Sequence, residues 1–367
     1  MRRSRIFLSP PFVGPEERRA VEKAFDSGYV APCGPMVDEF ERRLAKLSGR
    51  QHAVVVSGGT AAIDLLMAEF GVDSSWTVLA PTLTFIATVG PAWHRGAKLV
   101  FIDSDATGNM DVSLLSRALA DLARPNRSPT QTRRRPRLLV LGVDLYGRCC
   151  DYDAIAALCE QYGAVYVNDS AEAVGARYKG RPAGSAGIAA VYSFNGNKII
   201  TTSGGGAIVT DDAGIAARAR KRSQQSREPF PWYQHEEVGY NYRLSNLLAA
   251  VGLAQLKKLK GILAKRRAHA ERYREVLDLL PEVEGENHWL SVALTDSEKA
   301  RDRLLTRFAK ADIEARPVWK PLHLQPVFRG SRTYGGEVAE TLFALGLCLP
   351  SGTGLTDADF RRIFKVL

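Results

Sequence analysis

The amino-acid sequence predicts an α/β fold, with a large domain built on a mostly parallel, doubly wound sheet and a smaller α+β domain at the C-terminus. Three observations support this prediction. Short apolar segments alternate with amphipathic helical patterns up to residue 210, these segments are apolar on both faces, and the pattern becomes irregular after Asp211. The chain has 367 residues, which is enough for one large domain and a smaller one.

The first half supplies the strands and helices of the predicted sheet. Strands are expected over residues 52–56, 76–80, 97–103, 137–142, 164–169 and 189–194. Amphipathic patterns predict helices over residues 60–70, 85–93, 112–122 and 152–162. In an open parallel sheet, ligands bind at the carboxyl ends of the strands, so residues that follow a strand are the first candidates for a site.

The second half has a different character. Residues 226–243 are aromatic, polar and irregular, and a long helix is expected from Ser245 to about Leu280, bridging two domains. A strand over 288–294, a helix around 299–310 and a loop over 316–326 follow. We expect a large domain at 15–240 and a small domain at 241–367, with the N-terminal segment 1–14 packed on the small one.

Composition restricts the class of protein. No apolar run reaches the ~18 residues of a membrane-spanning helix, and the basic N-terminus is followed by too short an apolar part for a signal peptide. A cytoplasmic protein without a membrane partner is therefore expected. The five cysteines are odd in number and form no metal-binding spacing, which favours reduced thiols.

The net charge of +10 raises the question of nucleic-acid binding. Much of the excess lies in Arg124–Arg137, "RPNRSPTQTRRRPR", which has no apolar period. No aromatic residue is interleaved with its arginines. We favour a basic surface loop over a nucleic-acid or phosphate patch, and expect no nucleic-acid partner.

The segment "SGGTAAI" follows the strand 52–56 and opens a helix. Gly58 and Gly59 allow a sharp turn, after which the amides of Thr60 and Ala61 would point out of a helix N-terminus. Such amides suit a phosphate. The alternative is a strand-to-helix turn with no ligand, in which Thr60 caps the helix.

Two further strand ends carry an aspartate and a lysine. Asp169 closes the strand 164–169, where a buried carboxylate needs a cationic or hydrogen-bonding partner, although it could also cap a helix. Lys198 follows the strand 189–194 and the turn "NGN", where a partly desolvated amine would be a usable nucleophile, although turn lysines are commonly solvated. A phosphate cradle, a strand-end aspartate and a lysine are together what pyridoxal 5'-phosphate requires.

With these residues in view, the sequence resembles the DegT–StrS group of sugar-nucleotide aminotransferases. The resemblance covers nearly the whole chain and is carried by "SGGTAAI", "APTLTFIATV", "DSAEAVGA", "SFNGNKIITTSGGGAIVT", "GYNYRLSN" and "RPVWKPLHLQP". It implies the aspartate-aminotransferase-like fold (pyridoxal phosphate fold type I) with pyridoxal 5'-phosphate as cofactor and pyridoxamine 5'-phosphate as intermediate. The segments "SFNGNKIITTSGGG" and "RPVWKPLHLQP" are most similar to the UDP-4-amino-sugar, bacillosamine-type branch.

The resemblance assigns roles around the cofactor ring. It implies that Lys198 is the catalytic residue, forms a Schiff base with the cofactor and moves the proton between substrate and cofactor. Asp169 would pair with the pyridine nitrogen, Phe85 would stack on the ring, and Glu172 would lie near the ring hydroxyl.

The resemblance also assigns the phosphate ligands. Ser193 would bind the phosphate together with the backbone at Gly59, Thr60 and Ala61. Asn241 would reach the phosphate of a neighbouring subunit, which implies a homodimer with shared active sites.

Substrate residues are expected in the loop that follows residue 315. Arg316, Lys320 and His323 could meet a diphosphate, and Trp319 could stack on a base or sugar, although a packing role for this proline-rich loop is an equal alternative. Tyr29 is a further candidate for the sugar pocket. His323 has no second His or Cys at a suitable spacing, so no metal is expected.

The resemblance implies transfer of the amino group of L-glutamate to a UDP-linked 4-keto-6-deoxy-N-acetyl-hexose, giving a UDP-4-amino sugar. The alternative is a dTDP- or GDP-linked 3- or 4-keto sugar. This chain departs from the family pattern at Gly58, commonly Ser, and at Asn168 and Ser170 beside the aspartate. It has Lys198 where the related dehydratases carry His. A binding protein that keeps the fold without the chemistry is disfavoured by the retained lysine.

Overall fold

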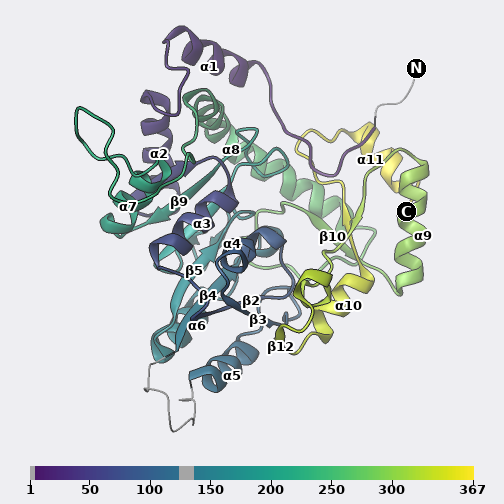
Figure 1. Ribbon diagram of the computed structural model, residues 1–367. Helices are drawn as coiled ribbons and strands as arrows, with labels where there is room; N and C mark the ends of the chain where they lie inside the picture. The colour runs from purple at the N-terminus through teal and green to yellow at the C-terminus, as the bar shows by residue number, and fades with distance from the viewer. Residues whose placement is uncertain (1–4, 124–135) are drawn as a thin grey trace.

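The computed structural model describes residues 5–123 and 136–367 (Figure 1). The predicted basic loop Arg124–Arg137 therefore lies, except for its last two residues, outside the described residues. Within the described part of the chain, no helix is both long and apolar enough to cross a lipid bilayer.

An eight-stranded sheet forms the centre of the molecule, with the strand order β1-β9-β8-β5-β4-β2-β3-β12. Its strands are β1 (His52–Val56), β2 (Trp76–Pro81), β3 (Lys98–Ile102), β4 (Arg137–Val143), β5 (Val165–Asp169), β8 (Ala189–Ser193), β9 (Gly206–Thr210) and β12 (Arg332–Tyr334). Neighbouring strands from β8 to β12 are parallel, whereas β9 runs antiparallel to both β1 and β8. The six predicted strands are confirmed, and β9 and β12 are added to them.

Helices cover both faces of this sheet. They are α1 (Pro15–Asp26), α2 (Pro35–Ser48), α3 (Gly59–Glu69), α4 (Gly90–His94), α5 (Val112–Ala123), α6 (Tyr152–Tyr162), α7 (Ala213–Ser223) and α8 (Asn246–Arg274). Side chains of α3, α4 and α7 pack on one face. The opposite face is covered by α2 and α8 at one end and by α5 and α6 at the other. Strand residues alternate between the two layers, which is why the strands are apolar on both faces.

A second, three-stranded antiparallel sheet lies beyond α8, with the order β10-β13-β11. It contains β10 (Ser291–Leu294), β11 (Arg316–Pro317) and β13 (Gly346–Leu349), and it packs with α9 (Glu298–Lys310), α10 (Glu337–Leu345) and α11 (Asp357–Phe364). The N-terminal segment begins beside α11 and crosses to α1 (Figure 1), and Ile6 forms a parallel bridge with Ile313. A small hairpin of β6 (Arg177–Tyr178) and β7 (Arg181–Pro182) completes the strands.

Three sequence-based boundaries differ from the structure. The predicted helix 85–93 is wrong: Phe85 is extended, a 3-10 turn η1 (Ile86–Thr88) follows, and α4 begins only at Gly90, with Pro91 in its first turn. The long helix α8 ends at Arg274, before the predicted Leu280. The strand predicted from residue 288 begins at Ser291, because His288 has a left-handed backbone conformation with φ of 52°.

Candidate active site

The carboxyl ends of β1, β2, β5 and β8 meet at one edge of the central sheet, where they open onto a cavity of about 730 Å³. The sequence predicted nine of the side chains and backbone positions that line it. They are Gly59, Thr60, Phe85, Asp169, Glu172, Ser193, Lys198, Arg316 and Trp319. Residues that lie at the ends of different strands therefore meet in one cavity.

Lys198 lies in the turn after β8, and its side chain is only 13% exposed. Its Nζ donates a hydrogen bond to Glu172 Oε1 at 3.0 Å and lies 4.1 Å from the ring centroid of Trp289. The backbone amide of Lys198 donates to the carbonyl of Asn195 at 3.0 Å, which closes the turn. The amine is thus held inside the cavity by a carboxylate and an aromatic face.

Asp169 ends β5 and is buried. Its Oδ2 accepts a hydrogen bond from the Thr88 hydroxyl at 2.8 Å, and its Oδ1 accepts one from the Ala171 amide at 3.1 Å. Burial raises the pKa of this carboxyl, although both hydrogen bonds and the charge of Lys198 act in the opposite direction. A cationic ring N–H would relieve the cost of burying this charge, which makes the site suited to a pyridinium.

Glu172 joins the lysine to the loop after β4. Its Oε2 accepts a hydrogen bond from the Tyr146 amide at 2.8 Å, while Oε1 binds Lys198. Burial raises the pKa of Glu172, and the neighbouring charge of Lys198 lowers it. Lys198 and Glu172 therefore form a buried ion pair that orients the amine.

The turn from β1 into α3 forms the anion-binding side of the cavity. Gly58 is the N-cap and α3 begins at Gly59, so Thr60 lies inside the first turn and does not cap the helix. The first N–H groups of a helix have no partner within it, and here they lie beside Ser193. A Cβ on Gly59 would approach Ser193 Cβ to 3.2 Å, and one on Gly206 would come within 2.5 Å of the Gly58 carbonyl carbon. The glycines therefore permit this close packing of turn, strand and helix.

The aromatic rings of Phe85, Trp289 and Trp319 line another part of the cavity, and the buried Tyr146 packs against the two tryptophans. Phe85 packs on Trp319 with ring centroids 5.7 Å apart, and Trp319 packs on Tyr146 at 5.1 Å. Trp289, in turn, lies 6.1 Å from Tyr146. The sequence analysis missed Tyr146 and Trp289. Tyr146 directly follows the loop at the end of β4, so the strand-end rule could have found it, but Trp289 comes from a distant segment with no local signal.

Two of the predicted substrate residues are not among the cavity-lining residues. Both ring nitrogens of His323 are engaged: Nδ1 contacts the Thr82 hydroxyl at 2.6 Å, and Nε2 contacts Glu340 Oε1 at 3.1 Å. This arrangement supports packing of the loop over substrate contact. Lys320 is exposed and also lies outside the cavity lining.

Three more predicted residues lie elsewhere. Ala61 lines a second hollow, which shares Ser57, Gly58 and Thr60 with the main cavity. Tyr29 is half exposed in the connection between α1 and α2. Asn241 is exposed and bridges to Gln224, so within this chain it does not reach the cavity.

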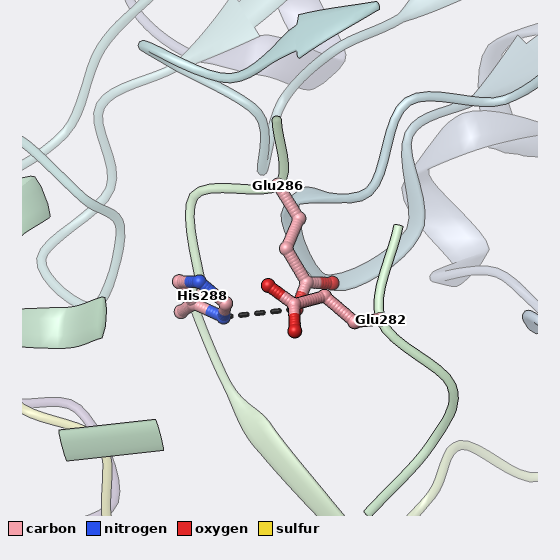
Figure 2. A group of neighbouring side chains, drawn as sticks. All are labelled: Glu282, Glu286 and His288. Atoms are coloured by element: carbon pink, nitrogen blue, oxygen red, sulfur yellow. Dashed lines mark ion pairs between the residues drawn. The ribbon is translucent and has the colours of Figure 1, made fainter. Parts of the chain in front are cut away.

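A group of potential metal ligands lies in the segment before β10. Figure 2 shows Glu282, Glu286 and His288, whose ligand atoms lie within 4.8 Å of one another. Glu286 binds the Arg148 side chain at 2.6 Å and His288 Nδ1 at 2.9 Å, and Arg274 binds both glutamates. Since two guanidinium groups already neutralise the two carboxylates, we interpret the group as an ion-pair network.

The cavity residues fit pyridoxal phosphate. The helix N-terminus beside Ser193 suits a phosphate, Asp169 lacks only a cationic partner, and the Lys198 amine suits an aldehyde. Together with the mostly parallel sheet, these features indicate a pyridoxal phosphate-dependent enzyme.

Residues 11–367 match the model of the DegT/DnrJ/EryC1/StrS aminotransferase family, and the chain belongs to this family. It is 41% identical to "Putative pyridoxal phosphate-dependent aminotransferase EpsN" of Bacillus subtilis, over 99% of this chain and 95% of that protein. It is 33% identical to the GDP-perosamine synthase of Caulobacter vibrioides, over 99% of this chain and 97% of that protein. A crystal structure of a family member from Brucella abortus superposes with a TM-score of 0.86, at 28% identity over 96% of this chain and 94% of that one. The predicted fold class, cofactor and enzyme class are confirmed.

Proposed function

We propose that this enzyme transfers the amino group of L-glutamate to a UDP-linked 4-keto-6-deoxy-N-acetyl-hexose, giving a UDP-4-amino sugar. The observation that carries the aminotransferase chemistry is the buried Lys198–Glu172 pair, which shares one cavity with Asp169. A cavity of about 730 Å³ has room for a cofactor and a substrate group together.

Each residue has a defined task in this proposal. When bound, the cofactor supplies an electron sink that makes a hydrogen on the substrate carbon acidic. Lys198 Nζ takes that proton and returns it to a neighbouring carbon, while Glu172 keeps the amine oriented. Asp169 holds the ring nitrogen, and Ser193 with the first amides of α3 holds the phosphate.

The substrate side of the cavity offers one cation besides Lys198 among its described lining residues. Arg316 lies 2.8 Å from Glu314 and is 69% exposed, so it can turn towards an anionic ligand. Both substrates are anions, L-glutamate through its carboxylates and the sugar through its diphosphate. We assign Arg316 to anion binding and Trp319 to stacking on sugar or base.

The choice of UDP rests on the likeness of "SFNGNK" and "RPVWKPLHLQP" to one branch of the family. The second candidate is a GDP-linked 4-keto sugar, which is favoured by the 33% identity to a GDP-perosamine synthase. The test incubates the protein and pyridoxal phosphate with L-glutamate and, separately, UDP-, GDP- and dTDP-linked 4-keto sugars, and identifies products by mass spectrometry and NMR. Turnover of the GDP sugar without the UDP sugar would replace the first candidate by the second.

The role of Lys198 has its own control. Purified wild-type protein should be yellow with bound cofactor, and Lys198→Ala should remove both the colour and the transamination. A wild-type protein that stays colourless after addition of pyridoxal phosphate would contradict the role of the cavity.

We also propose a cytoplasmic homodimer with shared active sites. Asn241 does not line the cavity of its own subunit, so it could reach only the cavity of a neighbouring one. The segment around it exposes the apolar side chains of Trp232, Tyr233 and Val238, which an interface between subunits would cover. Mixing inactive Lys198→Ala and Asn241→Ala proteins under exchange conditions should restore activity, since a mixed dimer has one complete site. Mixtures that remain inactive, or a monomeric mass in solution, would contradict sharing.

A further inference from the structure

Trp289 makes a contact with the catalytic lysine that nothing in the family pattern quoted above assigns. It lies two residues before β10, lines the cavity and is 3% exposed. Lys198 Nζ lies over its ring, 4.1 Å from the centroid, while the same nitrogen donates a hydrogen bond to Glu172 at 3.0 Å. An ammonium at this distance from an indole face is attracted by the negative charge of the ring surface.

The edge of the same indole holds the residue before the lysine. Trp289 Nε1 donates a hydrogen bond to the Asn197 carbonyl at 2.7 Å, and the Ser9 hydroxyl donates a second one to the same oxygen, also at 2.7 Å. The backbone next to Lys198 is therefore held from two directions. One side chain thus contacts both the reacting nitrogen and the peptide that carries it.

The indole itself is rigidly placed. The Trp289 amide donates to Asn287 Oδ1 at 2.9 Å, and Asn287 Nδ2 donates to the Glu172 carbonyl at 2.8 Å. From α8, the buried Arg266 donates to the Trp289 carbonyl at 2.7 Å and to the Ser9 hydroxyl at 3.1 Å. The same network therefore ties Trp289, Glu172 and Ser9 together around the lysine.

We propose that Trp289 is a positioning residue for Lys198: its ring face holds the charged amine against Glu172, and its N–H fixes the turn at Asn197. This inference rests on the proposed role of Lys198. When Nζ takes a proton from the substrate carbon, it becomes an ammonium, and this charge must be stabilised until Nζ returns the proton. The indole face stabilises this charged form without adding a further acid or base to the cavity.

The test measures the lysine in the protein without cofactor. Acetic anhydride reacts with an uncharged amine, so trace labelling of Lys198, followed by mass spectrometry, reports how strongly its surroundings stabilise the ammonium. Tryptophans with increasing fluorine substitution are introduced at position 289 alone. Fluorine weakens the negative face while preserving the ring's shape and N–H, so labelling should increase stepwise, reaching about tenfold.

Trp319 provides the matched control, because it lines the same cavity and packs on Phe85 and Tyr146. The same substitutions at position 319 should leave the labelling of Lys198 within about twofold. In the cofactor-loaded enzyme, the position 289 series should lower kcat for the glutamate half-reaction and leave the KM of glutamate unchanged.

Labelling that does not respond to fluorination at 289, or responds equally at 319, overturns the proposal. These readings are independent of the role of Lys198, which the colour of the Lys198→Ala protein tests separately. Glu172→Gln, which removes the charged partner at 3.0 Å, should increase the labelling and shows that the assay detects the loss of a contact.

Discussion

Asp144 is predicted to make the stability of this enzyme depend on pH. It directly follows β4 and is fully buried behind Asp169, whose carbonyl accepts a hydrogen bond from the Asp144 amide at 3.0 Å. Its carboxylate accepts hydrogen bonds from Ser170 Oγ at 2.6 Å, Tyr152 OH at 2.7 Å and Asn168 Nδ2 at 3.0 Å. Asn168 and Ser170, the two residues beside Asp169 that depart from the family pattern, thus donate hydrogen bonds to the buried Asp144 carboxylate.

Burial raises the pKa of Asp144 from 3.8 to about 6, because the cost of desolvation exceeds the help of its hydrogen-bond donors. Between these two values the folded protein retains a proton that the unfolded chain has released. The stabilising contribution of Asp144 is therefore fully present below pH 3.8, the pKa of the group in the unfolded chain, and is lost as the pH rises through about 6. The loss is about 3 kcal/mol, since each pKa unit corresponds to ~1.4 kcal/mol.

Asp144→Asn removes this titration. The variant is less stable at every pH, because an amide cannot accept from all of these donors. The informative quantity is the free energy of unfolding of the wild type minus that of the variant. We expect this difference to fall by about 3 kcal/mol between about pH 4 and about pH 8. It is measured by urea denaturation of the cofactor-free protein, followed by tryptophan fluorescence under reversible conditions.

Ser170→Ala provides the control. It removes a donor that lowers the pKa of Asp144, so the loss of stability should be larger and extend to higher pH. A difference between wild type and Asp144→Asn that is constant across this pH range, or that rises with pH, would refute the reasoning.

Three other substitutions have expected outcomes. A Cβ on Gly58 would meet nothing within 4 Å, so Gly58→Ser should add a helix cap and a hydrogen-bond donor for the phosphate. The dissociation constant of pyridoxal phosphate, measured by absorbance titration, should fall about tenfold. An unchanged dissociation constant would contradict this expectation. Thr88→Val removes the hydroxyl that lowers the pKa of Asp169, so the acid limb of the pH–kcat profile should move to higher pH, and an unmoved limb would argue against it. Glu314→Gln weakens the ion pair that holds Arg316 and leaves this guanidinium free to bind the substrate. The KM of the nucleotide sugar should therefore fall by up to about fivefold with kcat unchanged. A higher KM would contradict anion binding by Arg316.

The strands of the central sheet were predictable because they are buried on both faces. In the run "HAVVV", residues 53–56 pack alternately against α2 on one side and α3 on the other, so burial selects apolar residues at all four positions. Strand direction was not predictable in the same way. Among the described strands, the neighbour of β1 in this sheet is the antiparallel β9, and nothing in the composition of β1 distinguishes it from the parallel strands.

The apolar pattern of the sequence predicted the wrong secondary structure in a segment whose backbone positions side chains at the cavity. The apolar run at 85–93 predicts a helix, yet Phe85 is extended and 55% exposed at the cavity, and the 3-10 turn after it directs Thr88 to Asp169. An aromatic side chain that faces a ligand has the same composition as one that packs in a core. Only the tertiary structure separates the two.

The sequence alone determined the class of fold, the cofactor and the three positions expected to hold it, because Asp169 ends a strand and Lys198 and the "SGGTAAI" turn each follow one. Parallel strands place their carboxyl ends at one edge, so these residues, far apart in the chain, were expected at the same edge of the sheet. What surrounds the lysine was decided by tertiary structure. Glu172, Trp289 and Ser9 come from three distant segments, and their convergence on Lys198 and Asn197 depends on how α8, the N-terminal segment and β10 pack together.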